Sequence, residues 1–186
     1  MNRVITKEII ETANRLSSIK ILIAESDPMR RCGLENILSS YLHLEIITAA
    51  DELTTIRLVE RAKPDLIVLD LSLNPFSCKG IIDNIKQNYP NIKILAYTNS
   101  TKKEDIFEAI GNGVDGYFIK DNDVDGLLTA IATIMNDGFY LDSQIKSIVT
   151  NNLYFCNLAN NFNELSQREW EILKYIVQGN NNFEIG

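Results

Sequence analysis

Short apolar runs recur along the chain and alternate with longer segments of helical periodicity. The apolar runs have the length of strands and are Ile19–Ala24, Leu44–Thr48, Leu66–Leu69, Ile92–Tyr97 and Tyr117–Ile119. The other segments repeat apolar side chains every three or four residues, which predicts helices; they are residues 28–38, 52–62, 80–88, 102–110 and 124–136. Strands that are apolar at nearly every position are typical of parallel sheets covered by helices on both faces.

The alternation predicts an α/β fold with one five-stranded parallel sheet. The flavodoxin-like strand order 2-1-3-4-5 is the natural arrangement, and it places the first and third strands side by side. We expect Asp27 to cap the first helix, with Pro28 in its first turn. The apolar side of that helix is expected to hold Met29, Cys32, Leu34, Ile37 and Leu38.

The segments outside this alternation have other patterns. Ser166 and Glu169 form a capping box, which predicts that a further helix begins there. Asparagines crowd the stretch before it, as in loops. The chain is therefore expected to divide into an N-terminal amphipathic extension at 1–18, an α/β domain at 19–136, a linker at 137–163 and a helical unit at 164–186.

Composition narrows the class of protein. The 186 residues are 45% hydrophobic and 23% charged, a globular composition, and their net charge of −7 argues against a chain built mainly around nucleic acid. No apolar run approaches the roughly 20 residues of a membrane helix. Three widely spaced cysteines favour a reducing compartment, and the lone His43 argues against a histidine-based site. Many Ile and Asn residues with few Ala indicate an A+T-rich genome, such as that of a plastid or an endosymbiont.

Polar side chains stand where the predicted strands end. Glu25 follows the first strand, Asp70 the third, Thr98 the fourth and Lys120 the fifth. Parallel strands bring their carboxyl ends to one edge of the sheet, where open α/β folds place their chemistry. Two carboxylates, a hydroxyl and an ammonium at one edge could hold a hard metal ion and accept a phosphoryl group.

Longer motifs surround these residues and resemble two known families. Residues 19–136 resemble the receiver domain of response regulators through ILIAESDP at 21–28, PDLIVLDLS at 64–72, AYT at 96–98 and GYFIKD at 116–121. Residues 137–186 resemble the linker and first part of a LuxR/NarL-type helix-turn-helix through GFYLD at 138–142, LSQRE at 165–169 and QGNNNFEI at 178–185. Together with the composition, the chain is similar to regulators of this type encoded in algal plastids.

The resemblance implies a role for each residue at the strand ends. Asp70 matches the aspartate that accepts the phosphoryl group, Thr98 the switch hydroxyl and Lys120 the ammonium that pairs with the phosphoryl oxygen. Tyr117 matches the aromatic residue that changes rotamer on activation. Phosphorylation would then alter the surface formed by the fourth helix, the fifth strand and the fifth helix, which a partner reads.

The sequence departs from the family at the metal side of this site. The family has two adjacent acids after the first strand, and here Ser26 takes the place of the second one, which normally binds Mg²⁺ directly. Serine is a poor substitute, because Mg²⁺ prefers anionic oxygens in octahedral geometry. The expected ligands are Glu25, Asp27, Asp70 and the backbone carbonyl of Ser72, with weak Mg²⁺ binding.

The helical unit at 164–186 is expected not to bind specific DNA by itself. In the family the recognition helix, which enters the major groove, follows the segment at which this sequence stops. The unit carries four glutamates against Arg168 and Lys174, so no basic stripe is present to contact phosphates. No DNA-binding residue is assigned, and DNA becomes a partner only with a complete helix-turn-helix.

The resemblance implies a two-component response regulator of the DNA-binding class. It would be a phosphoryl acceptor rather than an enzyme, with a sensor histidine kinase as partner, without membrane association and with homodimerisation left open. Its location would be the cytoplasm, or the plastid stroma if a plastid encodes it. The alternative is a phosphorylation-independent pseudo-receiver that acts by protein interaction, which Ser26 favours. A third possibility, a flavodoxin-like enzyme or nucleotide binder, lacks phosphate-cradling glycines after the first strand.

Overall fold

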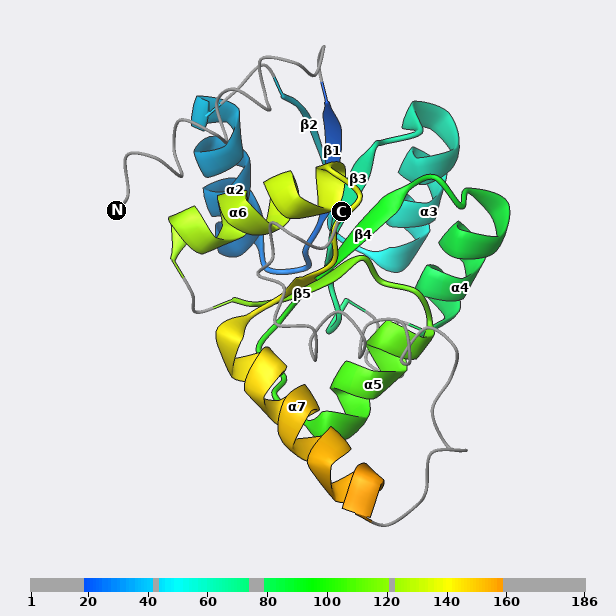
Figure 1. Ribbon diagram of the computed structural model, residues 1–186. Helices are drawn as coiled ribbons and strands as arrows, with labels where there is room; N and C mark the ends of the chain where they lie inside the picture. The colour runs from blue at the N-terminus through cyan, green and yellow to red at the C-terminus, as the bar shows by residue number, and fades with distance from the viewer. Residues whose placement is uncertain (1–18, 42–43, 74–78, 121–122, 159–186) are drawn as a thin grey trace.

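A computed structural model describes residues 19–41, 44–73, 79–120 and 123–158 of the chain (Figure 1). Its strands are β1 (Lys20–Ala24), β2 (Glu45–Ala49), β3 (Leu66–Asp70), β4 (Lys93–Thr98), β5 (Gly116–Ile119) and β6 (Tyr140–Leu141). Its helices are α2 (Pro28–Tyr41), α3 (Glu52–Ala62), α4 (Lys79–Asn88), α5 (Lys103–Gly111), α6 (Val124–Met135) and α7 (Ser143–Leu158). The N-terminal extension at 1–18 and the helical unit at 164–186, both predicted from sequence, lie outside these ranges.

One parallel sheet organises the described residues. Its order is β2-β1-β3-β4-β5-β6, and every pairing is parallel. The predicted α/β class and the order 2-1-3-4-5 are confirmed. Strand β3 is buried at every position, as the unbroken apolar run predicted.

Helices cover both faces of the sheet and enclose two apolar clusters. Leu34 and Leu38 of α2 share one cluster with five buried residues of α6. The other face packs against α3, α4 and α5, and it includes Ile145 and Val149 of α7. Figure 1 shows α2 and α6 together on one side of the sheet, with α3 and α4 on the other and α7 beside α5. None of the described helices is long and apolar enough to cross a bilayer.

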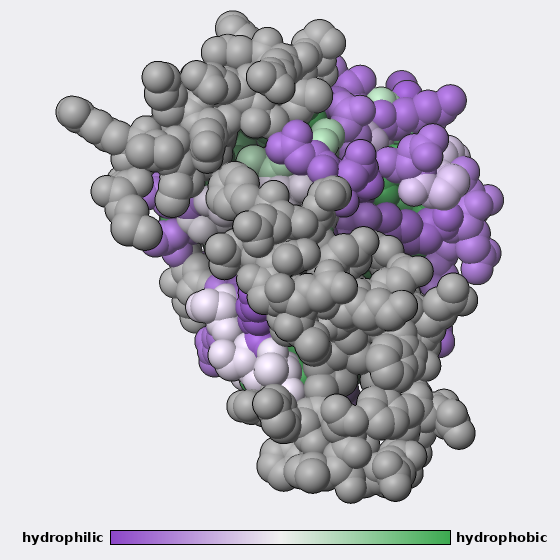
Figure 2. Space-filling model, viewed as in Figure 1, coloured by the Kyte–Doolittle hydropathy of each residue, from purple (hydrophilic) through white to green (hydrophobic). Residues whose placement is uncertain are grey.

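The outer surface follows from this layering. Figure 2 shows hydrophilic residues over α3 and α4, the helices that lie on the right in Figure 1. Among the described residues, the large hydrophobic side chains that are exposed are Met29 and Leu53. The prediction that Met29 and Cys32 belong to the buried side of α2 is therefore wrong, because Met29 is 82% exposed and Cys32 is also exposed. They lie on the opposite side of α2 from Leu34 and Leu38, which pack on the sheet.

The range predicted as a linker begins with regular structure. Strand β6 pairs with β5, and α7 follows directly. The physical reason is the apolar run Phe139, Tyr140 and Leu141, which is buried against the sheet. The sheet thus gains a sixth strand, and the start of the predicted linker at 137 lies within the same packed body.

Gly116 permits the close approach of β5, β6 and α6. A Cβ at this position would lie 2.7 Å from Ile134 Cδ1, 3.1 Å from Leu95 Cδ1 and 3.2 Å from Tyr140 Cβ. We expect Gly116→Ala to destabilise the protein by about 1–3 kcal/mol through overpacking. The measurement is urea unfolding followed by circular dichroism.

The control is Gly111→Ala at the end of α5, where an added Cβ meets nothing within 4 Å. This substitution should be neutral or slightly stabilising, because alanine is the better helix former. Equal stability of both variants would contradict the overpacking argument.

Candidate functional site

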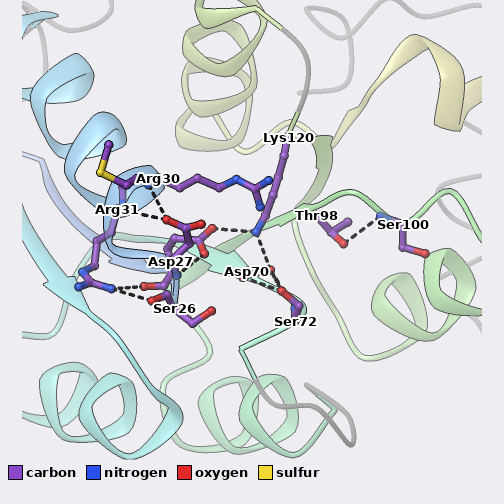
Figure 3. Close-up of polar contacts among 11 residues, drawn as sticks. Ser26, Asp27, Arg30, Arg31, Asp70, Ser72, Thr98, Ser100 and Lys120 are labelled. Atoms are coloured by element: carbon purple, nitrogen blue, oxygen red, sulfur yellow. Dashed lines mark hydrogen bonds and ion pairs between the residues drawn. The ribbon is translucent and has the colours of Figure 1, made fainter.

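The ends of β1, β3, β4 and β5 form the predicted cluster of polar residues (Figure 3). Glu25 follows β1, Asp70 and Thr98 are the last residues of β3 and β4, and Lys120 follows β5. The parallel pairing of these neighbouring strands places all four ends at the same edge. Glu25, Asp70 and Thr98 are all buried.

Lys120 bridges the two carboxylates. Its Nζ lies 2.7 Å from Glu25 Oε2 and 2.8 Å from Asp70 Oδ1. All three side chains are at most 3% exposed. Its Nζ also lies 5.1 Å from the centre of the Tyr97 ring, within the range of a cation–π contact. Two negative charges and one positive charge are therefore enclosed together, and the ammonium offsets their mutual repulsion.

Ser72 contacts the Asp70 carboxylate from the other side. Its N–H donates to Oδ1 over 2.8 Å, and its hydroxyl oxygen lies 2.7 Å from each carboxylate oxygen. Burial raises the pKa of Asp70, but the hydrogen bonds from Lys120 and Ser72 outweigh it, and the pKa lies below its ordinary value. The Asp70 carboxyl is therefore ionised at neutral pH. The sequence pattern indicated only the backbone carbonyl of Ser72 as a ligand, and the contact of its hydroxyl with Asp70 was not expected.

Thr98 belongs to a chain of hydrogen bonds that reaches Tyr117. Thr98 Oγ1 accepts from the N–H of Ser100 over 3.1 Å, and the Tyr117 hydroxyl donates to the Ser100 carbonyl over 3.0 Å. The Ser100 hydroxyl donates to Asp105 in the first turn of α5. The Tyr117 side chain is fully buried, and this burial raises the pKa of its hydroxyl. Ser100, which sequence reasoning did not single out, connects the two predicted switch residues.

The two residues after Glu25 are exposed, and one of them caps a helix. Asp27 Oδ1 accepts from the N–H groups of Met29 and Arg30 over 2.8 and 3.1 Å. Hydrogen bonds from the Arg30 and Met29 N–H groups lower the pKa of Asp27. The Asp27 N–H in turn donates to Glu25 Oε1 over 2.9 Å. The predicted cap is confirmed.

Arg31 holds the backbone of the same turn. Its Nη1 donates to the carbonyl oxygens of Glu25 and Ser26 over 2.6 and 3.3 Å (Figure 3). Nothing in the sequence pattern indicated this contact. This contact fixes the turn that carries Ser26, so the Cα of residue 26 has a defined position at the edge of the site.

The acidic residues fit a hard cation only weakly. Within the described ranges, no three His, Cys, Asp or Glu side chains are grouped so that they could hold a metal ion. Glu25 and Asp70 meet at Lys120, which already supplies a positive charge, while Asp27 caps α2. The carboxylate oxygens suit Mg²⁺ in kind, but the arrangement offers few of them. The ligand set of Glu25, Asp27, Asp70 and the Ser72 carbonyl stays a prediction.

A flavodoxin-like sheet with a buried aspartate, a bridging lysine and a strand-end threonine defines a receiver domain. Residues 21–132 match the family model described as the response regulator receiver domain, and the chain belongs to that family. It is 34% identical to the oxygen regulatory protein NreC of Staphylococcus aureus strain MRSA252 over 176 residues, which are 90% of this chain and 81% of the relative.

Solved structures show the same fold. A LuxR-family two-component response regulator from Aurantimonas sp. SI85-9A1 matches with a TM-score of 0.70 and 23% identity, over 74% of this chain and 99% of that one. A LuxR-family DNA-binding response regulator from Staphylococcus aureus matches with a TM-score of 0.59 and 23% identity, over 63% of this chain and 99% of that one. The family match and the identity to NreC place the chain among response regulators, and the solved structures share its fold.

Proposed function

We propose that the chain is a two-component response regulator that accepts a phosphoryl group on Asp70 and thereby controls transcription. The observation that carries the proposal is the buried Asp70 carboxylate, held as an anion 2.8 Å from the Lys120 ammonium. An isolated strand-end aspartate has no need of such a partner. A buried carboxylate can accept a phosphoryl group, and the neighbouring ammonium can balance the negative charge that this group brings.

The transfer itself is a nucleophilic displacement. An Asp70 oxygen forms a bond to phosphorus as the bond from phosphorus to the donor, a histidine of a sensor kinase, breaks. Lys120 balances charge on the transferred group. The Thr98 hydroxyl would rotate from Ser100 and donate to a phosphoryl oxygen. The Ser72 hydroxyl lies 2.7 Å from both Asp70 oxygens and donates to one at a time, so it would turn away from the oxygen that attacks.

A magnesium ion, when bound, neutralises charge on the transferring group. Glu25, Asp70 and the Ser72 carbonyl would hold it, with Asp27 available only if it leaves its capping position. Lys120 then no longer needs to balance both carboxylates. The chain's own contribution is to position Asp70 and to keep bulk water away from it.

The proposed switch runs from Thr98 through Ser100 to Tyr117. If Thr98 turns toward the phosphoryl group, Ser100 loses the hydroxyl that its N–H contacts, and the Ser100 carbonyl that holds Tyr117 can shift. Asp105 would pass this movement to α5 through its bond to Ser100.

The partners follow from the family. A sensor histidine kinase would supply the phosphoryl group, and DNA would be bound through a complete helix-turn-helix. We propose that the protein lies in the cytoplasm or, if a plastid encodes it, in the stroma. There it would act as a phosphoryl acceptor rather than as an enzyme. Homodimerisation is compatible with this scheme.

A pseudo-receiver that works without phosphorylation is the second candidate. Ser26 at the metal side of the site favours it, because a serine supplies no anionic oxygen for Mg²⁺ there. The two functions differ in Mg²⁺ affinity, because a working receiver needs the ion and a pseudo-receiver does not.

Intact mass spectrometry tests the proposal. The protein, incubated with Mg²⁺ and acetyl phosphate, should gain a single phosphoryl group, and Asp70→Ala should gain none. Asp137→Asn is the matched control, because Asp137 is an exposed aspartate that pairs with Lys93 away from the site. Absence of an adduct on the folded parent protein would reject the phosphoryl acceptor in favour of the pseudo-receiver.

A further inference from the structure

The segment that follows α6 is fastened to the site end of β5. We refer to residues 139–150, which contain β6 and the first half of α7, as the strap. Tyr140 and Leu141 pair with Gly116 and Tyr117, and the Asp142 N–H donates to the Tyr117 carbonyl over 3.1 Å. The buried Asp142 carboxylate accepts from the Ile119 N–H over 3.0 Å. Ile119 immediately precedes Lys120, so this side chain fixes the backbone that carries the bridging ammonium.

A row of aromatic rings makes a second connection between the strap and Lys120. The Lys120 ammonium lies over Tyr97, whose ring stacks on Phe118 with 6.1 Å between centroids. Phe118 meets Tyr140 of the strap at 6.2 Å. These rings are buried, and side chains in a close-packed core cannot shift independently. A displacement of Lys120 therefore requires Tyr140 to move as well.

The other face of the strap packs on the predicted switch elements. Leu141, Ile145 and Val149 share an apolar cluster with Tyr117 and with the buried residues of α5. Helix α5 also carries Asp105, the partner of Ser100. Figure 1 shows α7 alongside α5. The strap thus covers the part of the α5–β5 surface that we expected a separate partner to read.

We propose that the strap is the element that reports the state of Asp70 to the residues beyond it. The inference rests on the proposed function. A phosphoryl group on Asp70 occupies the space at Oδ1 that the Lys120 ammonium now holds, so the ammonium moves outward to pair with a phosphoryl oxygen and Ile119 moves with it. The bond from Asp142 to the Ile119 N–H weakens, and the strap loosens. Because such coupling is reciprocal, a loosened strap raises the affinity of the site for the phosphoryl group by the same factor.

Hydrogen exchange of the full chain tests whether a phosphoryl analogue at Asp70 loosens the strap. Beryllofluoride with Mg²⁺ is the probe, as a stable analogue of the phosphoryl group. On binding, the α7 amides from Lys146 to Thr150 should exchange about fivefold faster or more, while β1 and β3 amides should not. Binding of the probe without any change in α7 would overturn the proposal.

The affinity for beryllofluoride tests the reciprocal effect, in which a loosened strap strengthens binding at the site. Asp142→Ala should bind it about fivefold more tightly or better. The matched control is Asp115→Ala, because Asp115 accepts from the Ile94 N–H over 2.8 Å at the opposite end of β5. Asp115→Ala should leave the affinity unchanged. An equal gain in both variants would overturn the proposal, since it would reflect general loosening.

Asp142→Asn guards against loss of folding in Asp142→Ala. It keeps an acceptor oxygen but loses the charge, so a smaller gain in the same direction is expected. Failure of beryllofluoride to bind the folded parent protein would reject the proposed function and the coupling with it. Binding without a response in either test would reject the coupling alone.

Discussion

Lys120→Ala is expected to lower the free energy of unfolding by about 3–5 kcal/mol, because it leaves two buried carboxylates without their cation. Glu25 and Asp70 are each 1% exposed and share the ammonium through contacts of 2.7 and 2.8 Å. Guanidinium chloride unfolding of the apo protein at neutral pH gives the value. Lys93→Ala is the control, because Lys93 pairs with an Asp137 that is 83% exposed, and its loss should cost less than about 1 kcal/mol. Similar losses in the two variants would contradict the argument.

The pH dependence of this difference has a definite sign. In the parent protein the pKa of Asp70 is lowered, so its contribution to stability is complete above the ordinary value of 3.8 and is lost as the pH falls through the native pKa. In Lys120→Ala, burial would instead raise the pKa of the Asp70 carboxyl and destabilise its charged form. The gap in stability between parent and Lys120→Ala should therefore narrow as the pH falls toward about 4. Adding Asp70→Asn to Lys120→Ala should recover part of the loss at neutral pH.

Ser26→Asp is expected to raise the affinity for Mg²⁺ about tenfold or more, equivalent to about 1.4 kcal/mol. Ser26 follows Glu25 at the end of β1, and Arg31 holds the backbone of both residues. A carboxylate there adds an anionic oxygen and offsets the positive charge of Lys120, which favours a hard cation. Isothermal titration calorimetry with MgCl₂ measures the gain.

Ser39→Asp is the matched control for Ser26→Asp. Ser39 is exposed near the end of α2, so the substitution changes the net charge equally while staying far from the turn after β1. It should leave the affinity for Mg²⁺ unchanged. If both variants gained affinity equally, the effect would come from net charge rather than from a new ligand.

The sequence predicted the sheet because its inner strands β1, β3, β4 and β5 are buried at nearly every position and so are almost entirely apolar. The strand β6 was missed because it has two residues, too few for a pattern. Met29 and Cys32 were misplaced because both side chains are apolar, but at about 3.6 residues per turn they lie nearly opposite Leu34 and Leu38, on the side that does not pack.

The site was predicted in its members but not in its contacts. Strand order brings Glu25 and Asp70 together, so that Lys120 can meet them from β5. The bridge by Lys120 and the two-oxygen contact of the Ser72 hydroxyl depend on rotamers, which a residue pattern does not encode. Arg31 donates to a backbone carbonyl, and Ser100 contacts Thr98 and Tyr117 through its own backbone, so neither belongs to a sequence motif that we could recognise.

The parallel sheet also sets an order of events for a chain leaving the ribosome. Lys120 and Glu25 are 95 residues apart in sequence, and their contact requires β5 to dock on β4, β4 on β3 and β3 on β1. Contacts so distant in sequence form late, because they follow the closure of long loops. Until β5 arrives, Glu25 and Asp70 lack their shared cation and stay hydrated. A nascent chain therefore has no working site before its sheet is nearly complete.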